Sequence, residues 1–305
     1  MQSVLVLGSN SLIGQKLIKL LALNDDFYVI ATSKTRNKIS EECNCIFEFV
    51  DVTRSIELVM LFEKYNPDIV VNLVAKASPD WCEENKVECW DTNVNAVENI
   101  VQLANQFESH LIHYSTDFIF DGIMGNYFEE DIPNPQNYYG LSKMESENIL
   151  IRNSKKWTII RTALVYGYEP EISRTNIVLS VKKNLEEGKK IHFAQDQFRT
   201  PTFADDIAQA CVQIIKNQKL GIYHISGNEY MSVYEMTKIV AEYFALDSRL
   251  IIPINTVDLN EKAKRPFRTG MKTDKAYNEI GFSPIPITEA LKIIKNQMNR
   301  YGKQD

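Results

Sequence analysis

Three side chains between residues 113 and 143 have the types and spacing that a hydride-transfer enzyme requires. Tyr139 and Lys143 stand four residues apart in YYGLSK, so on a helix both side chains project from one face. Thr116 follows HLIHYS, an apolar run typical of a buried parallel strand. An ammonium lowers the pKa of a nearby phenol, so Tyr139 could donate a proton to a carbonyl oxygen that Thr116 holds in place. We therefore predict Thr116, Tyr139 and Lys143 as the catalytic residues.

A second tyrosine–lysine pair has the same spacing and serves as an internal comparison. Tyr234 and Lys238 lie in GNEYMSVYEMTKIVAEYF, where Ser232 and Glu235 form the sequence pattern of a capping box at the start of an amphipathic helix. No strand that ends in serine or threonine precedes this pair at a comparable distance. We therefore interpret the second pair as structural.

The amino terminus predicts a dinucleotide site. QSVLVLGSNSLIGQKLIKLLA consists of an apolar strand, a tight turn between two glycines, and a helix with one apolar stripe. Such a turn presents backbone N–H groups and the positive end of the helix to a pyrophosphate. A serine stands where the three-glycine pattern has its middle glycine. The predicted cofactor contacts in this turn are Gly8, Asn10, Ser11, Leu12, Ile13 and Gly14.

The end of the second predicted strand bears on which dinucleotide binds. NAD sites usually have an acidic residue there, which holds the ribose hydroxyls. This chain has no carboxylate between Phe27 and Ile39, and it offers Ser33, Lys34 and Arg36 instead. Cations suit a 2′-phosphate, so the sequence favours NADPH over NADH. The alternative interpretation is a solvated basic loop.

Further strand–helix units predict an α/β fold, a doubly wound parallel Rossmann-type sheet with a smaller carboxyl-terminal substrate-binding domain. No linker divides the chain, so we expect interleaved domains: residues 1–166 and 202–225 in the NADP-binding part, and residues 167–201 and 226–305 in the substrate-binding cap. Ligands bind at the carboxyl ends of such strands. The additional cofactor contacts expected there are Asp51, Val52, Val74, Ala75, Lys76, Asn93 and Leu164, beside Tyr139 and Lys143.

Several motifs together resemble the extended short-chain dehydrogenase/reductases, and within them the dTDP-4-dehydrorhamnose reductase family. They are STDFIFDG (115–122), EEDIPNPQNYYGLSK (129–143), RTALVYG (161–167), DQFRTPTFADDIAQA (196–210), GIYHISG (221–227) and Arg265-Pro266. The resemblance covers nearly the whole chain. It implies reduction of a 4-keto-6-deoxy sugar nucleotide by NADPH, with the Thr116, Tyr139, Lys143 triad as catalytic residues. It also implies that the nucleotide sugar binds between the sheet and the cap.

The expected substrate contacts lie on both sides of that cleft. Thr116, Asp117 and Phe118 come from the strand end, and Asn176, Arg199 and Arg265 come from the cap and its loops. A guanidinium matches phosphate oxygens in a fork, so both arginines are candidates for the sugar diphosphate. The alternative is that both arginines stabilise the loops around Pro201 and Pro266. Ser11, Phe118, Leu164 and Arg199 depart from the family pattern, which leaves the nucleotide base and the sugar open.

Two other functions stay open. GIYHISGNEYMSVYEM and EEDIPNPQNYYG also resemble the regulatory beta subunit of methionine adenosyltransferase, which implies a non-catalytic dinucleotide-binding role. A sugar-nucleotide dehydratase or epimerase is the other alternative. Dehydratases place Asp-Glu after the threonine, whereas Phe118 follows Asp117 here. Epimerases favour tightly held NAD, which does not fit Lys34 and Arg36.

The amino-acid composition limits the classes of partner and the cellular compartment that we expect for this protein. A net charge of −6 argues against nucleic acid as a partner. Five cysteines, an odd number, suggest a reducing compartment, and neither they nor the four histidines have metal-ligand spacing. The first strand begins by Val4 and no apolar run approaches ~20 residues, so we expect no signal peptide, no membrane span and a cytoplasmic location. The oligomeric state is open, a homodimer being one option.

Overall fold

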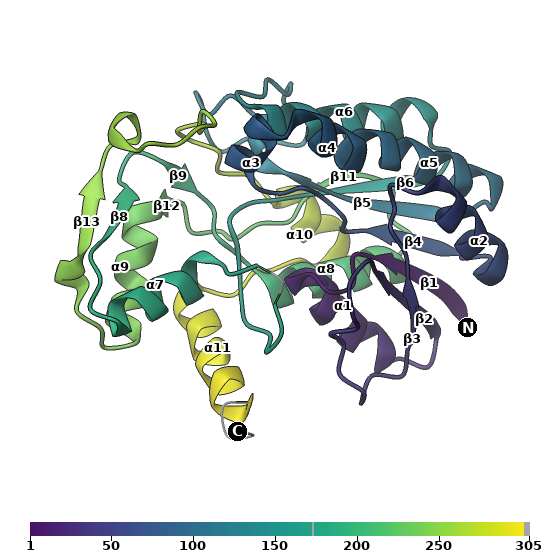
Figure 1. The fold of residues 1–305 in the computed structure, drawn as a ribbon, viewed down its shortest axis with the longest axis horizontal. Helices are drawn as coiled ribbons and strands as arrows, with labels where there is room; N and C mark the ends of the chain where they lie inside the picture. The colour runs from purple at the N-terminus through teal and green to yellow at the C-terminus, as the bar shows by residue number, and fades with distance from the viewer. Residues whose placement is uncertain (173, 302–305) are drawn as a thin grey trace.

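The structure is a computed structural model that describes residues 1–172 and 174–301. The predicted cap segments include Ser173 and residues 302–305, and these positions lie outside the described residues. Figure 1 shows a sheet-bearing part, which contains the N-terminus, beside a smaller cap built mainly from later segments. Ligand-binding crevices of doubly wound folds lie where the strands end, so the arrangement of these ends matters most for function.

The described residues form one central sheet of seven parallel strands in the order β11-β6-β5-β4-β1-β2-β3. This order confirms the predicted doubly wound parallel sheet. The strands are nearly continuous apolar runs because both faces of the sheet are covered by helices. Their bounds are β1 (Gln2–Leu7), β2 (Phe27–Ser33), β3 (Ile46–Phe49), β4 (Ile69–Asn72), β5 (His110–Thr116), β6 (Trp157–Thr162) and β11 (Gly221–His224).

Two hydrophobic clusters lie on opposite faces of this sheet. Helices cover both faces (Figure 1). One face is covered by α1 (Leu12–Ala22), α8 (Ala204–Lys216) and α10 (Asp274–Ile280). The other is covered by α2 (Ser55–Tyr65), α5 (Ala96–Gln106) and α6 (Tyr138–Asn153). Strand residues alternate between the two clusters, so Leu111 of β5 faces α5 and α6 while Ile112 faces α1 and α8.

The helical region between β4 and β5 is divided into several segments. The chain forms α3 (Pro79–Glu84), α4 (Lys86–Trp90), a π-helical turn η1 (Asp91–Asn95) and then α5. Single π-helical turns often occur at functional sites because they displace one side chain from the regular helical face. Here the turn contains Asn93, one of the predicted cofactor residues.

The cap has its own hydrophobic cluster. Its main elements are α7 (Ile177–Glu186), β8 (Ile191–Ala194), α9 (Val233–Tyr243), β13 (Ile251–Ile254) and α11 (Ile287–Tyr301). The predicted capping box is present, with Ser232 Oγ accepting the N–H of Glu235 and the Glu235 carboxylate accepting the N–H of Ser232. Two short pairings lie within the parts: β10 (Thr202–Phe203) with β7 (Val165–Tyr166) in the sheet-bearing part, and β12 (Met231–Ser232) with β9 (Phe198–Arg199) in the cap.

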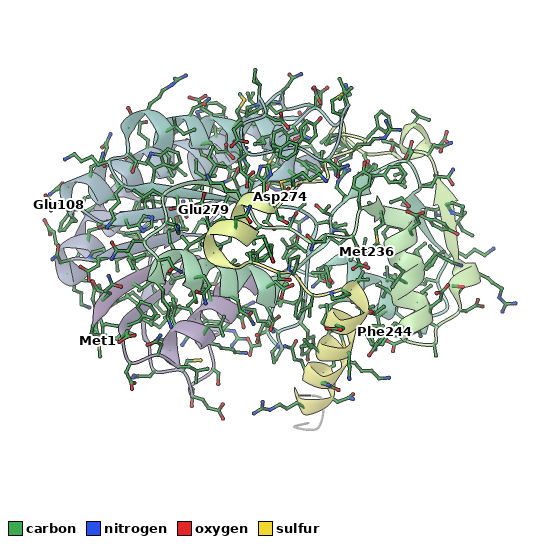
Figure 2. The ribbon with its side chains drawn as sticks, turned by 180° about the vertical axis from the view of Figure 1, so that it is seen from behind. Met1, Glu108, Met236, Phe244, Asp274 and Glu279 are labelled. Atoms are coloured by element: carbon green, nitrogen blue, oxygen red, sulfur yellow. The ribbon has the colours of Figure 1, made fainter. Side chains whose placement is uncertain are left out.

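One segment of the expected cap packs elsewhere. Ala276 and Ile280 of α10, and Phe282 after it, belong to the cluster on the main sheet. Figure 2 shows α10, marked by Asp274 and Glu279, against the sheet-bearing part, whereas α9, marked by Met236 and Phe244, lies at the opposite end. These apolar side chains complete the face that α1 and α8 leave open. We propose the interleaved division with residues 274–282 moved to the sheet-bearing part.

Candidate active site

The glycine turn after β1 has the shape of a phosphate-binding cradle. Gly8 adopts φ +86°, and a Cβ on it would lie 3.1 Å from a Val74 methyl carbon. A Cβ on Gly14 would lie only 2.7 Å from the carbonyl oxygens of both Gly8 and Ser9. The two glycines therefore permit a backbone approach that other residues would block. This cradle at the N-terminus of α1 fits a dinucleotide pyrophosphate.

Ser11 has a definite local role. It is the N-cap of α1, and its hydroxyl accepts the N–H of Gly14 at 3.0 Å. This bond satisfies a backbone donor that the first helical turn leaves without a partner. Leu12 and Ile13 follow as the first helical residues, half-buried beside the turn.

The predicted basic loop is held to the glycine turn by Asn10. This buried side chain donates to Thr35 Oγ1 at 2.9 Å and to the Arg36 carbonyl at 2.8 Å, and it accepts the N–H of Lys38 at 3.1 Å. Asn10 therefore positions the loop on which Lys34 and Arg36 lie. The sequence did not single out Thr35, whose hydroxyl also lies 3.2 Å from that of Ser33.

Both basic side chains are exposed and have acidic neighbours. Lys34 Nζ lies 3.9 Å from a carboxylate oxygen of Asp51, and Arg36 lies 2.6 Å from Glu171. Asp51 lies two residues after the end of β3 at Phe49. The structure thus brings Ser33, Lys34 and Asp51 to neighbouring strand ends, with Val52 buried beneath them.

Asn93 holds the loop after β4 in place by hydrogen bonds to its backbone. Its side chain accepts the N–H of Lys76 at 2.8 Å and donates to the Lys76 carbonyl at 3.2 Å and to Ser142 Oγ at 2.9 Å. Asn93 is fully buried, so it positions the partly exposed Val74, Ala75 and Lys76 rather than presenting its own amide at the surface. The sequence predicts that Asn93 contacts the cofactor directly. Because its side chain is buried in the π-helical turn, it positions the neighbouring loop instead.

The catalytic candidates meet at the end of β5. Thr116 is the last residue of that strand, and its hydroxyl is close enough to the Tyr139 phenol to influence the pKa of that group. Asn137 caps the N-terminus of α6 by accepting the N–H of Gly140 at 2.8 Å, so Tyr139 lies in the first turn of that helix and Lys143 in the next. Burial raises the pKa of Tyr139, and the nearby Thr116 hydroxyl offsets this effect only in part. Tyr139 is therefore a protonated phenol near neutral pH, which is the form that can donate a proton.

Lys143 has a partner that the sequence analysis missed. Its Nζ lies 2.8 Å from Nε2 of His113 on β5, and both residues are buried. Burial lowers the pKa of Lys143 to about 8. Strand alternation supplies a signal that could have found this contact, because His113 shares its face of β5 with Leu111, which packs toward α6.

Arg199 lies deeper than expected for a substrate contact. Its guanidinium donates to the carbonyl oxygens of Phe198 at 2.8 Å and Pro266 at 2.8 Å, and its Nε lies 3.6 Å from Asp117. The side chain is only 3% exposed, because two loops and the end of β5 enclose it. The structure thus places Arg199 in the loop-stabilising role that the sequence left open. Phe118 lies between its guanidinium, at 5.4 Å, and the Tyr139 ring, at 6.0 Å.

Arg265 and Asn176 lie closer to the surface. Arg265 donates to Asp80 at 2.7 Å and lies 3.3 Å from Glu261. Asn176 caps α7 by accepting the N–H of Leu179 at 3.4 Å, and its amide donates to the Gly167 carbonyl at 2.8 Å. Both are partly exposed. Their hydrogen bonds hold loops at the boundary between the sheet and the cap.

Leu164, a predicted cofactor contact after β6, has an unusual backbone. Its φ is +38°, in the left-handed region that a branched side chain rarely adopts. Its carbonyl accepts the N–H of Thr202, which begins β10. Backbone strain of this kind is common at functional sites, where the surrounding structure enforces it.

Among residues 1–172 and 174–301, no cluster of histidine, cysteine and acidic side chains could hold a metal ion. In the same part of the chain, no helix has the length and apolar character needed to cross a membrane.

Comparison with known proteins gives one family and two kinds of relative. The family model described as "RmlD substrate binding domain" matches residues 1–300. A dTDP-4-dehydrorhamnose reductase of Aggregatibacter actinomycetemcomitans is 29% identical over 308 residues, covering 97% of this chain and 99% of that protein. Methionine adenosyltransferase 2 subunit beta of Xenopus tropicalis is 29% identical over 255 residues, covering 82% of this chain and 74% of that protein.

The fold is shared with solved structures of the same kind. The dTDP-4-dehydrorhamnose reductase of Bacillus anthracis, solved in complex with NADP, superimposes with a TM-score of 0.83 at 22% identity, covering 97% of this chain and 100% of that one.

Proposed function

The chain belongs to the RmlD substrate binding domain family, and we propose that it is an NADPH-dependent reductase of a 4-keto-6-deoxy sugar nucleotide. The observation that carries this proposal is that Thr116, the last residue of β5, lies beside Tyr139 in the first turn of α6, one helical turn from Lys143. Two hydroxyl groups so placed can both reach one carbonyl oxygen.

Each of the three residues has a distinct part in the proposed reaction. NADPH supplies the hydride that reaches the keto carbon. Tyr139 donates its phenolic proton to the carbonyl oxygen, and Thr116 orients that oxygen by a hydrogen bond. Lys143 holds a ribose hydroxyl and, as an ammonium, stabilises the phenolate that remains on Tyr139. Burial keeps Tyr139 protonated before the reaction, which suits reduction rather than oxidation.

The preference for NADPH rests on the loop after β2. Lys34 and Arg36 are exposed there, and the loop itself has no carboxylate at the strand end to hold a 2′-hydroxyl group. The Bacillus anthracis structure with NADP, in the same fold, supports this choice. For the substrate, we propose Arg265 as the contact to the diphosphate, because it is the more accessible of the two candidate arginines.

The direct test is NADPH oxidation against a panel of 4-keto-6-deoxy sugars linked to dTDP, UDP and GDP. We expect turnover with at least one member, and the identity of that member would give the nucleotide base. Absence of turnover across the panel, with NADPH binding intact, would contradict the enzymatic assignment.

A regulatory role is the second candidate, and the similarity to methionine adenosyltransferase 2 subunit beta favours it. The enclosed guanidinium of Arg199 fits this candidate as well, because it removes one expected diphosphate contact. Titration calorimetry with dTDP or UDP in the presence of NADP⁺ separates the two functions. Diphosphate binding that is lost in Arg265→Ala supports the reductase. No nucleotide binding, together with a co-purifying synthetase, supports the regulatory subunit.

A further inference from the structure

The hydrogen bonds around His113 determine which ring nitrogen carries its proton. Asn72, the last residue of β4, accepts the N–H of Val74 on its amide oxygen at 3.0 Å. Its amide nitrogen therefore faces Nδ1 of His113, at 3.2 Å. An amide nitrogen can only donate, so Nδ1 is the unprotonated nitrogen and Nε2 carries the ring proton.

Ser146 is consistent with the same tautomer. Its hydroxyl donates to the Lys143 carbonyl at 2.7 Å, so its lone pairs are free to accept from His113 Nε2 at 3.1 Å. Asn72, His113 and Ser146 thus form a buried chain, and the one proton on Nε2 has two acceptors within reach, Ser146 Oγ and the nearer Lys143 Nζ. Buried polar groups of this kind are held strongly, because breaking the chain leaves an unsatisfied group.

This tautomer has a consequence for Lys143. Its Nζ lies 2.8 Å from the nitrogen that carries the proton, at a distance where one of the two groups must accept. An ammonium has no lone pair and cannot accept, whereas a neutral amine can. The hydrogen-bond pattern therefore fits an uncharged Lys143.

The charged groups around Lys143 do not strongly favour the ammonium over the neutral amine. Glu147, on the same helix, favours the ammonium, but its carboxylate is shared with Arg161 of β6 at 2.7 Å. The Cys89 thiol of α4 also favours it, and burial of Lys143 outweighs both. His113 is itself neutral, because burial lowers its pKa well below the usual value.

We propose that His113, fixed as the Nε2–H tautomer by Asn72, favours the uncharged form of Lys143, and that Lys143 takes up protons from solvent when it exchanges His113 for a ribose hydroxyl of the bound dinucleotide. His113 and Asn72 are positioning residues in this scheme, since they act through Lys143. The inference rests on the proposed dinucleotide-dependent function. It means that cofactor binding completes the conversion of Lys143 to the ammonium that stabilises the Tyr139 phenolate.

The test measures proton uptake rather than turnover. Calorimetry of NADPH binding in two buffers of different ionisation enthalpy, at about pH 8.5, should give an uptake of roughly 0.7 proton, since Lys143 starts near a pKa of about 8 and ends well above it. Asn72→Asp should reduce the uptake to roughly 0.2 proton or less. The carboxylate accepts from Nδ1, which leaves Nε2 as an acceptor for a charged Lys143 before binding.

Two further variants complete the test: one replaces Asn72→Asp if that variant does not fold, and the other is a matched control. If Asn72→Asp does not fold, His113→Gln replaces it, because the glutamine amide oxygen also accepts from an ammonium and should abolish most of the uptake. His110→Gln is the matched control. This histidine is buried on the same strand and bonds Thr158 at 2.8 Å, so its replacement should leave the uptake unchanged.

The possible results separate a failure of this inference about Lys143 from a failure of the proposed reductase function. NADPH binding without proton uptake in the wild type would overturn the inference and leave the reductase proposal standing. Uptake that persists in both Asn72→Asp and His113→Gln would also overturn it. Failure of NADPH to bind at all would overturn the inference and the proposed function together.

Discussion

Asp117 and Arg199 form a buried ion pair that joins the end of β5 to the cap, with 3.6 Å between Oδ2 and Nε. Asp117 also accepts from the hydroxyl of Thr116 at 3.1 Å and from that of Thr269. Burial raises the pKa of Asp117, and the Arg199 guanidinium opposes this effect. The pair therefore connects the position of Thr116, the threonine of the proposed catalytic set, to the position of the loop that carries Arg265.

Arg199→Ala tests that connection. Removing one member of a buried ion pair leaves the other charge without compensation, so we expect a loss of ~3–5 kcal/mol in the free energy of unfolding. Chemical denaturation measures it. Arg249→Ala is the control, since that arginine pairs with Asp247 on the exposed surface and should change stability little. A loss for Arg199→Ala no larger than for this control would contradict the structural role.

Tyr139→Phe tests the proton donor. The substitution removes the hydroxyl and keeps the ring, so NADPH binding should persist while turnover falls by roughly 10²-fold or more. Tyr234→Phe, in the second tyrosine–lysine pair on α9, should change turnover little. Turnover near that of the wild type in Tyr139→Phe would exclude Tyr139 as the general acid.

The double variant Lys34→Ala, Arg36→Ala tests cofactor choice. If these side chains bind the 2′-phosphate, NADPH should weaken by roughly tenfold or more per contact while NADH changes little. Affinities for both cofactors, measured by titration, check this. Equal losses would show instead that the cations form a solvated face beside Asp51 and Glu171.

The sequence was most informative where a local pattern determines the structure. The glycine turn, the capping box of α9 and the parallel strands follow from backbone sterics and apolar periodicity, which act over a few residues. The contacts of Arg199 and His113 depend on residues far away in the chain. Arg199 is enclosed by residues 266–267, and His113 meets Lys143 thirty residues later, so a local pattern identifies neither partner, although strand alternation places His113 on the face toward α6. The same holds for α10, whose apolar side chains complete a distant face of the sheet.

Gly140→Ala tests how closely α6 must approach the end of β5. A Cβ at this position would lie 2.2 Å from the carbonyl oxygen of Phe118, a backbone atom that cannot move freely. The first turn of α6 should shift, so we expect lower stability and a fall in turnover through displacement of Tyr139. Leu141→Ala, at the exposed next position, is the control. Steady-state kinetics and thermal unfolding measure both effects, and unchanged values for Gly140→Ala would contradict this packing.

Asp206 on α8 gives a prediction about pH. Burial raises the pKa of Asp206 to about 6, although its carboxylate accepts the N–H of Ile285 at 3.0 Å. A carboxyl group whose folded pKa is raised binds more protons in the folded state, so its contribution to stability declines as the pH rises from about 4 to about 6. Asp206→Asn keeps an oxygen acceptor without the charge. It should therefore raise the free energy of unfolding at neutral pH, and this gain should shrink toward pH ~4, where the wild-type group is protonated. Asp25→Asn, at an exposed position, should show no such dependence. Denaturation curves across this pH range measure both variants, and a gain for Asp206→Asn that grew toward acid would refute the assignment, because only a buried carboxylate loses its cost on protonation.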